Sequence, residues 1–244
     1  MAATLTLAAC GGSGKHSGGA SSTSAAVVQA VQKTVAAGSA HVLLATTVNA
    51  GAQSLSLTGT GDFDTKKRVG SLHGTFAVAG IRSTLDEVSS GSTIYVHSPF
   101  FATFLPGGKT WLSVDTGAAT SILGAAGSSV LAQDPSAIIG ELKTIGSVKS
   151  VGSEDVGGVK TTHYQGTLAA AKKLGVSGPI DVWVGDDGYV HKLQLTASSS
   201  SSTQHLKTAV TMTFSSYGKT VHVSTPRASA TVDASKVSIP GLGG

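Results

Sequence analysis

The sequence has few charged residues, few aromatic residues and a single cysteine. Charged residues make up 12% of the 244, against roughly 25% in typical globular proteins. Low charge and a positive mean hydropathy exclude disorder through charge excess. One cysteine excludes a scaffold stapled by intramolecular disulfides, and no apolar run approaches the roughly 20 residues that each helix of a multi-span membrane protein needs. The formal net charge of +4 is dispersed, so we expect no nucleic-acid partner.

The sequence also lacks the motifs of common catalytic and metal sites. It contains no G-x-S-x-G and no H-E-x-x-H. Gly107–Thr110 ends like a phosphate-binding loop, but residue 103, where that loop has its first glycine, is Thr103, so we interpret the segment as a hairpin turn. Asp186 and Asp187 are adjacent carboxylates, but they lie in a predicted turn, so a structural role explains them better than acid–base catalysis. We therefore expect no enzyme activity, no metal and no cofactor, leaving open a triad dispersed in sequence, as in an exported hydrolase. The histidines stand at wide intervals without ligand spacing: His16, His41, His73, His97, His163, His191, His205 and His222.

The one cysteine ends a short apolar segment. Leu7-Ala8-Ala9-Cys10 matches a lipobox, in which small residues precede the cleaved bond and the cysteine thiol receives a diacylglycerol. Glycine- and serine-rich residues follow up to residue 23, a composition typical of a flexible tether. The alternative is a cysteine that follows alanines by coincidence.

This pattern predicts how the N-terminal region is organised and where the protein is found. We expect residues 1–9 to be the remnant of a signal peptide and residues 10–23 to be the lipidated cysteine and its tether. The mature protein would be exported and anchored to the outer face of the cell membrane. Because no basic residue precedes the apolar stretch, we expect the true start to lie upstream or to be mis-assigned.

Two segments have helical periodicity. Valines recur every four residues from Val27 to Val35, ahead of Gly38, which predicts a helix over residues 24–37. Asp134-Pro135 predicts the start of a second helix, because a capping residue before proline is typical of helix N-termini. Its apolar face would comprise Ile138, Leu142 and Ile145, and Gly146 would end it. The segment 116–133 between them, rich in Ala, Gly and Ser, is interpreted as loose helix or loop.

Most of the remaining sequence alternates between polar and apolar residues. In residues 53–64 the odd positions from Leu55 to Phe63 are apolar or small and the even positions are polar, which predicts a strand with one face in water. A second alternating run carries Leu72, Phe76 and Val78 on one side, and Asp187-Gly188 is typical of a hairpin turn. Further strands are predicted at 41–49, 81–89, 93–97, 110–114, 148–155, 159–166, 180–185, 189–196, 206–217 and 220–224.

About eleven such strands predict an α+β protein whose sheet is an antiparallel meander, not a set of βαβ units. Helices must cover its apolar face, because a sheet with one wet face buries the other. We expect one domain over residues 24–234 and a flexible tail over 235–244.

These features resemble the actinobacterial lipoproteins LppX, LprA, LprF and LprG. The resemblance rests on the lipobox, the tether, the short N-terminal helix and the antiparallel run, and it covers residues from about 24 to 234. It implies a LolA-like fold, in which a curved antiparallel half-barrel wraps the helices and encloses an apolar cavity. It further implies a non-enzymatic carrier of acyl lipids or glycolipids. The specific segments are Gly107–Trp111 leading to Asp115, Val159–Tyr164, Ile180–Val184 running into Asp187–Val190, and Val223–Pro226.

A lipid carrier needs an apolar interior that its own side chains fill incompletely. We expect Gly59 and Gly61 to leave such room, and residues 116–133 to form either a lid or an ordinary loop. Phe100, Phe101 and Phe104 suit a cavity mouth, a membrane-touching loop or plain core packing. The predicted lining comprises Leu55, Leu57, Phe63, Leu72, Phe76, Val78, Leu85, Ile94, Phe100, Phe101, Phe104, Ile122, Leu123, Leu131, Ile138 and Leu142.

The expected partners follow from the same interpretation. They are an acyl lipid or glycolipid ligand, the membrane that holds the anchor, and a membrane transporter, with the protein itself a monomer. The alternative function is an envelope lipoprotein with a packed core that binds a partner or senses the envelope and carries no lipid.

Overall fold

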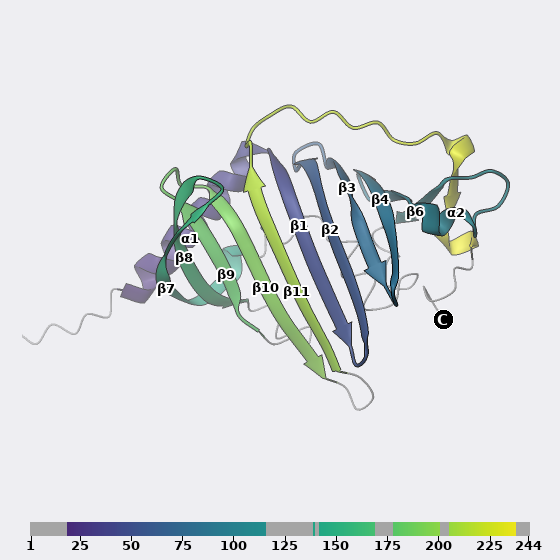
Figure 1. The fold of residues 1–244 in the computed structure, drawn as a ribbon. Coiled ribbons are helices and arrows are strands. Elements are labelled where there is room, and N and C mark those ends of the chain that lie inside the picture. The colour runs from purple at the N-terminus through teal and green to yellow at the C-terminus, as the bar shows by residue number, and fades with distance from the viewer. Residues whose placement is uncertain (1–18, 116–138, 140–141, 169–177, 201–204, 238–244) are drawn as a thin grey trace, which may run out of the picture.

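The computed structural model describes residues 19–115, 139, 142–168, 178–200 and 205–237 (Figure 1). In these residues the chain forms one open, curved sheet of twelve strands with two α-helices, α1 (Gly19–Ala37) and α2 (Pro99–Ala102). The predicted α+β class is confirmed. The strands are β1 (Ser39–Ala50), β2 (Gln53–Asp64), β3 (Val69–Val78), β4 (Ile81–Ser90), β5 (Thr93–His97), β6 (Trp111–Asp115), β7 (Ile145–Val156), β8 (Val159–Leu168), β9 (Ile180–Gly185), β10 (Val190–Ser200), β11 (His205–Ser215) and β12 (Thr231–Asp233).

The sheet consists of two antiparallel meanders joined side by side. Strands β1 to β6 pair in sequence order, as do β7 to β11, and β1 pairs with β11 to join them. The short strand β12 then adds to the edge of β6 in parallel, after the chain has crossed the end of the sheet (Figure 1). The predicted meander is therefore correct, apart from this one parallel pair.

The predicted strand at 220–224 is wrong. Residues 221–227 have no regular structure, and the last strand forms at Thr231–Asp233 instead. There the Ala230 carbonyl accepts a hydrogen bond from the Thr110 N–H (2.9 Å), and the ammonium of Lys109 binds the carbonyls of Ala228 and Ser229. These contacts join residues 228–230 to residues that precede β6 and lie far away in the sequence. They determine where the chain pairs with the sheet again.

The first predicted helix is confirmed as α1, whereas the second is wrong at its C-terminal end. Leu142–Thr144 is one 3₁₀ turn, and Ile145 and Gly146 begin β7 instead of ending a helix. Ile145 pairs with Leu168, and its side chain occupies the space above Gly166, where a Cβ would lie 2.8 Å from it. The missing side chain at residue 166 therefore gives Ile145 a site in the sheet. Asp134-Pro135 lies outside the described residues.

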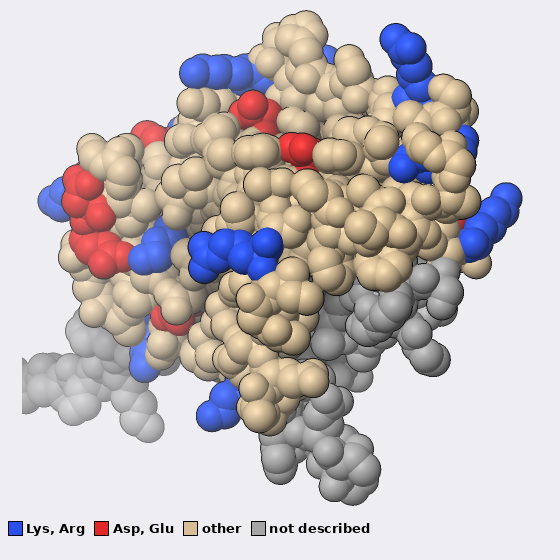
Figure 2. Space-filling view, turned by 45° about the vertical axis from the view of Figure 1, so that its right-hand side comes forward, with Lys and Arg blue, Asp and Glu red and all other residues tan. Residues whose placement is uncertain are grey.

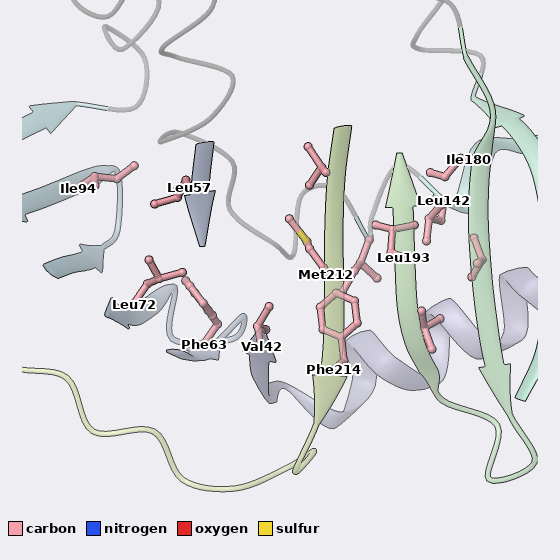
Figure 3. Packing of buried hydrophobic residues seen from close by; sticks show 14 of the residues in the cluster. Val42, Leu57, Phe63, Leu72, Ile94, Leu142, Ile180, Leu193, Met212 and Phe214 are labelled. Atoms are coloured by element: carbon pink, nitrogen blue, oxygen red, sulfur yellow. The ribbon is translucent and has the colours of Figure 1, made fainter. Parts of the chain in front are cut away.

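The two faces of the sheet differ in chemistry. We call inner the face that carries the buried side chains of Val42, Leu57 and Leu193, and outer the opposite face. Figure 3 shows buried inner-face side chains from successive strands, with Ile180, Leu142 and Leu193 close together beside α1. Polar residues alternate with them and face outward, as the period of two predicted.

Helix α1 covers the inner face of one half of the sheet. It packs against β7, β9, β10 and the turn at Leu142, and Val27 and Val31 are fully buried there. The Thr34 hydroxyl accepts a hydrogen bond from the Val190 N–H (2.9 Å), and the Lys33 ammonium binds the carbonyl of Asp187. The helix is therefore fixed to the β9–β10 hairpin by both apolar and polar contacts.

The glycines of β2 and β3 have a different role from the one predicted. A Cβ on Gly59 would lie 2.8 Å from the side chain of Leu72, and one on Gly61 would lie 1.9 Å from the Ser71 carbonyl oxygen. A Cβ on Gly70 would lie 2.3 Å from the ring of Phe63. The space above Gly59 and Gly70 is thus filled by neighbouring side chains, and Gly61 allows the two backbones to approach. These glycines permit close packing of the strands; they do not leave room for a ligand.

Candidate functional site

The inner faces of β2 to β5 carry many apolar side chains, among which Ser83, Glu87 and Ser89 of β4 also lie. Strand register places Leu57 opposite Phe76, and Leu85 opposite Gly74, whereas Ile94 and Val96 on β5 stand opposite Ser89 and Glu87. The apolar side chains among these belong to the buried hydrophobic cluster. The arrangement therefore joins four neighbouring strands into one surface suited to aliphatic groups.

One acidic residue lies among these apolar side chains. Glu87 stands on the inner face because it pairs with Leu72 on one side and with Val96 on the other, both of them buried. Its side chain is partly exposed. It follows Leu85 on the inner face of β4, where Ser83 and Ser89 also lie, and it brings a carboxylate to this face.

The phenylalanines predicted to cluster do so around a short helix. Ser98 caps α2 by accepting a hydrogen bond from the Phe100 N–H (3.3 Å). The rings of Phe100 and Phe101 lie 5.7 Å and 5.9 Å from that of Phe76 on β3. Phe104 packs against Phe100 at 6.0 Å and is 36% exposed. Phe100, Phe101 and Phe104 are close together in the sequence. Phe76 joins them only in the folded chain, where its ring lies beside α2.

The predicted lining residues separate into three groups in the structure. Leu57, Phe63, Leu72, Phe76, Leu85, Ile94, Phe101 and Leu142 are buried in one cluster, and Leu55, Val78 and Phe100 pack against it. Phe104 lies at the surface. Ile122, Leu123, Leu131 and Ile138 lie outside the described residues, as does Cys10.

Several residues of the cluster were missing from the predicted lining. Val96 lies beside the predicted Ile94, and the others come from strands that were predicted but whose inner face was not assigned: Val42, Val48, Leu112, Val114, Ile180, Val182, Leu193, Val210, Met212 and Phe214. The signal was present in the sequence, since Val210, Met212 and Phe214 alternate with threonines.

The outer face carries histidine–aspartate pairs that the sequence spacing did not indicate. Asp86 on β4 accepts hydrogen bonds from His73 on β3 (2.5 Å) and from His97 on β5 (3.4 Å). Hydrogen bonding from His73 outweighs partial burial and lowers the pKa of Asp86 below its ordinary value of 3.8. His163 and Asp181 form a similar pair at 2.8 Å. No group of three potential ligands suited to a metal ion occurs among the residues that the structure describes.

A further histidine–aspartate pair, on β1 and β2, has the connectivity of a catalytic triad. His41 Nδ1 binds Asp62 (2.8 Å) and its Nε2 binds the Thr60 hydroxyl (2.9 Å). Thr60 lies in β2, which pairs with β1 on one side and β3 on the other, so the strand's N–H groups serve the ladders. The face of a paired sheet does not present the two N–H donors that stabilise an oxyanion. The group is a hydrogen-bond chain across neighbouring strands.

The phosphate-loop alternative is excluded by the local geometry. Gly107 and Gly108 have φ angles of 60° and 71°, and the Lys109 N–H donates to the Pro106 carbonyl (3.2 Å), as in a tight turn. The lysine ammonium is engaged by the backbone near β12. Asp187 also lies in a turn, where it accepts a hydrogen bond from the Tyr189 N–H (3.1 Å).

Comparison with protein families and solved structures shows which proteins this chain resembles. The model of the LppX_LprAFG lipoproteins matches residues 22–223. The chain belongs to this lipoprotein family. The family resemblance seen in the sequence is therefore confirmed. No curated protein matches the chain.

Two mycobacterial structures share the fold. LppX of Mycobacterium tuberculosis is 16% identical, with a TM-score of 0.52, and the match covers 84% of this chain and 99% of LppX. LprF of Mycobacterium bovis is 15% identical, with a TM-score of 0.51, and the match covers 85% of this chain and 98% of LprF. At such identity the likeness establishes the architecture. Within the described residues of this lipoprotein, no helix is both long and apolar enough to cross a membrane.

Proposed function

We propose that this lipoprotein binds an acyl lipid or glycolipid on the inner faces of β2 to β5 and carries it across the cell envelope. The observation that carries the proposal is the set of apolar side chains, among them Leu57, Leu85 and Ile94, that neighbouring strands of a curved sheet present on one face. Membership of a lipoprotein family and the lipobox at Cys10 support an exported, membrane-anchored carrier.

Helix α1 supports this position of the ligand. It already packs on the inner faces of β7, β9 and β10, whereas α2 packs against β4 at one end of the other half. An acyl chain that lies across β2 to β5 would do for these strands what α1 does for β7 to β10. Each CH₂ removed from water contributes about 0.8 kcal/mol, so a chain of about 16 carbons offers on the order of 10 kcal/mol before ordering costs.

The resemblance to glycolipid carriers also allows a ligand with a polar end. Transfer across the envelope would further require a membrane transporter that loads or receives the lipid, with the carrier acting as a monomer.

A second candidate function rests on a specific observation. Leu57 and Leu85 are each only 1% exposed within the chain itself. This favours a packed core, and with it an envelope lipoprotein that binds a partner or senses the envelope. The two functions differ in whether lipid accompanies the purified protein.

Native mass spectrometry of the protein from an actinobacterial host separates them. The carrier should retain co-purified acyl lipid as a discrete added mass that organic extraction removes. Protein of apo mass only, together with failure to bind an apolar dye, would favour the packed module.

The anchor is tested separately by metabolic labelling with a palmitate analogue. The full-length chain should be labelled and Cys10→Ala should not. Labelling of the Cys10→Ala variant to the same level would overturn the anchor assignment without bearing on the ligand.

A further inference from the structure

Two hydrophobic side chains remain exposed at one end of the β1–β6 half. Ile81 is 49% exposed and Phe104 is 36% exposed. Ile81 begins β4 and lies four residues before Leu85, so both side chains are on the inner face. Helix α2 packs against the same strand, where the hydroxyls of Ser83 and Ser98 are 2.9 Å apart. We call the surface formed by Ile81, Pro99 and Phe104 the α2 tip.

The α2 tip is held rigidly from behind. The Phe104 ring rests on Phe100, which in turn packs edge-on against Phe76 and Phe101. The Phe104 N–H also donates to the Phe101 carbonyl at 2.9 Å. Insertion of this ring into an apolar phase would therefore need no rearrangement of the fold.

The charges in the segments around the tip all have the same sign. Arg82 follows Ile81, Lys109 follows the turn after Phe104, and Arg227 precedes the carbonyl of Ala228 that Lys109 binds. The segments 79–85, 98–114 and 216–232 contain no aspartate or glutamate, and Asp86, Asp115 and Asp233 directly follow them. Figure 2, which brings the right-hand side of Figure 1 forward, shows a largely uncharged surface from which Lys and Arg side chains project, with a few Asp and Glu side chains on the same face.

We propose that the α2 tip docks on the surface of an anionic phospholipid membrane. Phe104 and Ile81 would enter the interface while Arg82 and Arg227 bind headgroup phosphates. A small apolar surface with cations beside it fits the boundary between headgroups and acyl chains, where apolar burial and attraction to anionic lipid add. Docking there would bring the β1–β6 half next to the membrane, and it does not depend on whether the sheet carries a lipid.

Vesicle co-sedimentation tests this docking. The full chain is used with Cys10→Ser, so that no acyl anchor contributes to binding. Vesicles that contain phosphatidylglycerol should bind it more tightly than vesicles of phosphatidylcholine alone, and high salt should weaken the binding. In this background Phe104→Asp should weaken binding by about fivefold or more.

Leu43→Asp is the matched control, because Leu43 is 53% exposed on the outer face of β1, away from the tip. It should bind the vesicles like the parent. Equal losses for the two variants, or no preference for anionic vesicles, would overturn the proposal. As a second measurement, Phe104→Trp should keep binding and show a blue-shifted emission increment on anionic vesicles, whereas no such change would contradict insertion. Thermal unfolding checks that each variant is folded.

Discussion

The β7–β11 half of the sheet carries α1 on its inner face, whereas the β1–β6 half has the four-residue α2 at one end. In the first half, helix and sheet complete each other's packing, with Val31 fully buried between them. In the second half, the strands themselves supply many apolar side chains, from Leu57 to Val96. The comparison teaches that two similar meanders can serve as a helix-packed scaffold and as a candidate site for an aliphatic ligand.

Val31→Asp should have the largest effect, because it places a carboxylate in the fully buried contact between α1 and the sheet. We expect a loss of about 4 kcal/mol or more in the free energy of unfolding, measured by denaturant titration. Gln29→Asp, at an exposed position of the same helix, should change it by less than about 0.5 kcal/mol. Similar losses for both would mean that α1 is not the packing element of this half.

The second prediction compares one leucine from each half. Leu57 and Leu193 are both 1% exposed, and Leu193 lies in the half covered by α1. Leu193→Trp should overpack that contact and destabilise the protein by about 1–3 kcal/mol. Leu57→Trp should instead displace bound lipid and destabilise the lipid-free protein less.

Native mass spectra and thermal unfolding of the two variants, before and after delipidation, measure this difference. If Leu57→Trp keeps full lipid loading and loses as much stability as Leu193→Trp, the two halves do not differ in the way described.

Thr34→Val tests the polar contact that fixes α1. The valine has nearly the same shape but leaves the buried Val190 N–H without its acceptor. We expect a loss of about 1–3 kcal/mol in the free energy of unfolding, and faster hydrogen exchange at Val190. Unchanged exchange at that amide would show that another acceptor replaces the hydroxyl.

The smallest effect concerns the outer face and pH. Because His73 lowers the pKa of Asp86 in the folded protein below its ordinary value of 3.8, the unfolded state binds more protons as the solution becomes acidic. The stability that Asp86 contributes is present above that value and is lost as the pH falls through the lower, folded pKa. Asp86→Asn should therefore flatten the acid limb of a plot of unfolding free energy against pH. An unaltered limb would show that the pair does not contribute.

The alternation of residues in 53–64 was enough to predict β2 and its inner face, because a half-buried strand leaves a local signal. The pairing of β1 with β11 and of β12 with β6 leaves no such signal, since it depends on contacts between distant segments. The helical spacing of Ile145 was overridden by the site that Gly166 provides in the sheet. The sequence shows that residues 59 and 61 are glycines, but it does not show that a neighbouring side chain and a neighbouring backbone occupy the space beside them.

The histidine pairs show the same limit. His73, Asp86 and His97 are far apart in sequence, and register alone brings them together on the outer face. The candidate site was predicted best where it lies within single strands, as for Leu57 and Leu72. It was predicted least well for Val96 on β5 and Glu87 on β4, because the register of neighbouring strands places them on the inner face.

Photo-crosslinking with a diazirine fatty-acid analogue tests the central claim most directly, because peptide mapping locates the bound chain. The inner-face proposal predicts crosslinks in β2 to β5, around Leu57, Leu72 and Ile94, that competing acyl lipid abolishes. Crosslinks confined to α1 and β9–β10, or labelling that competing lipid does not reduce, would contradict it.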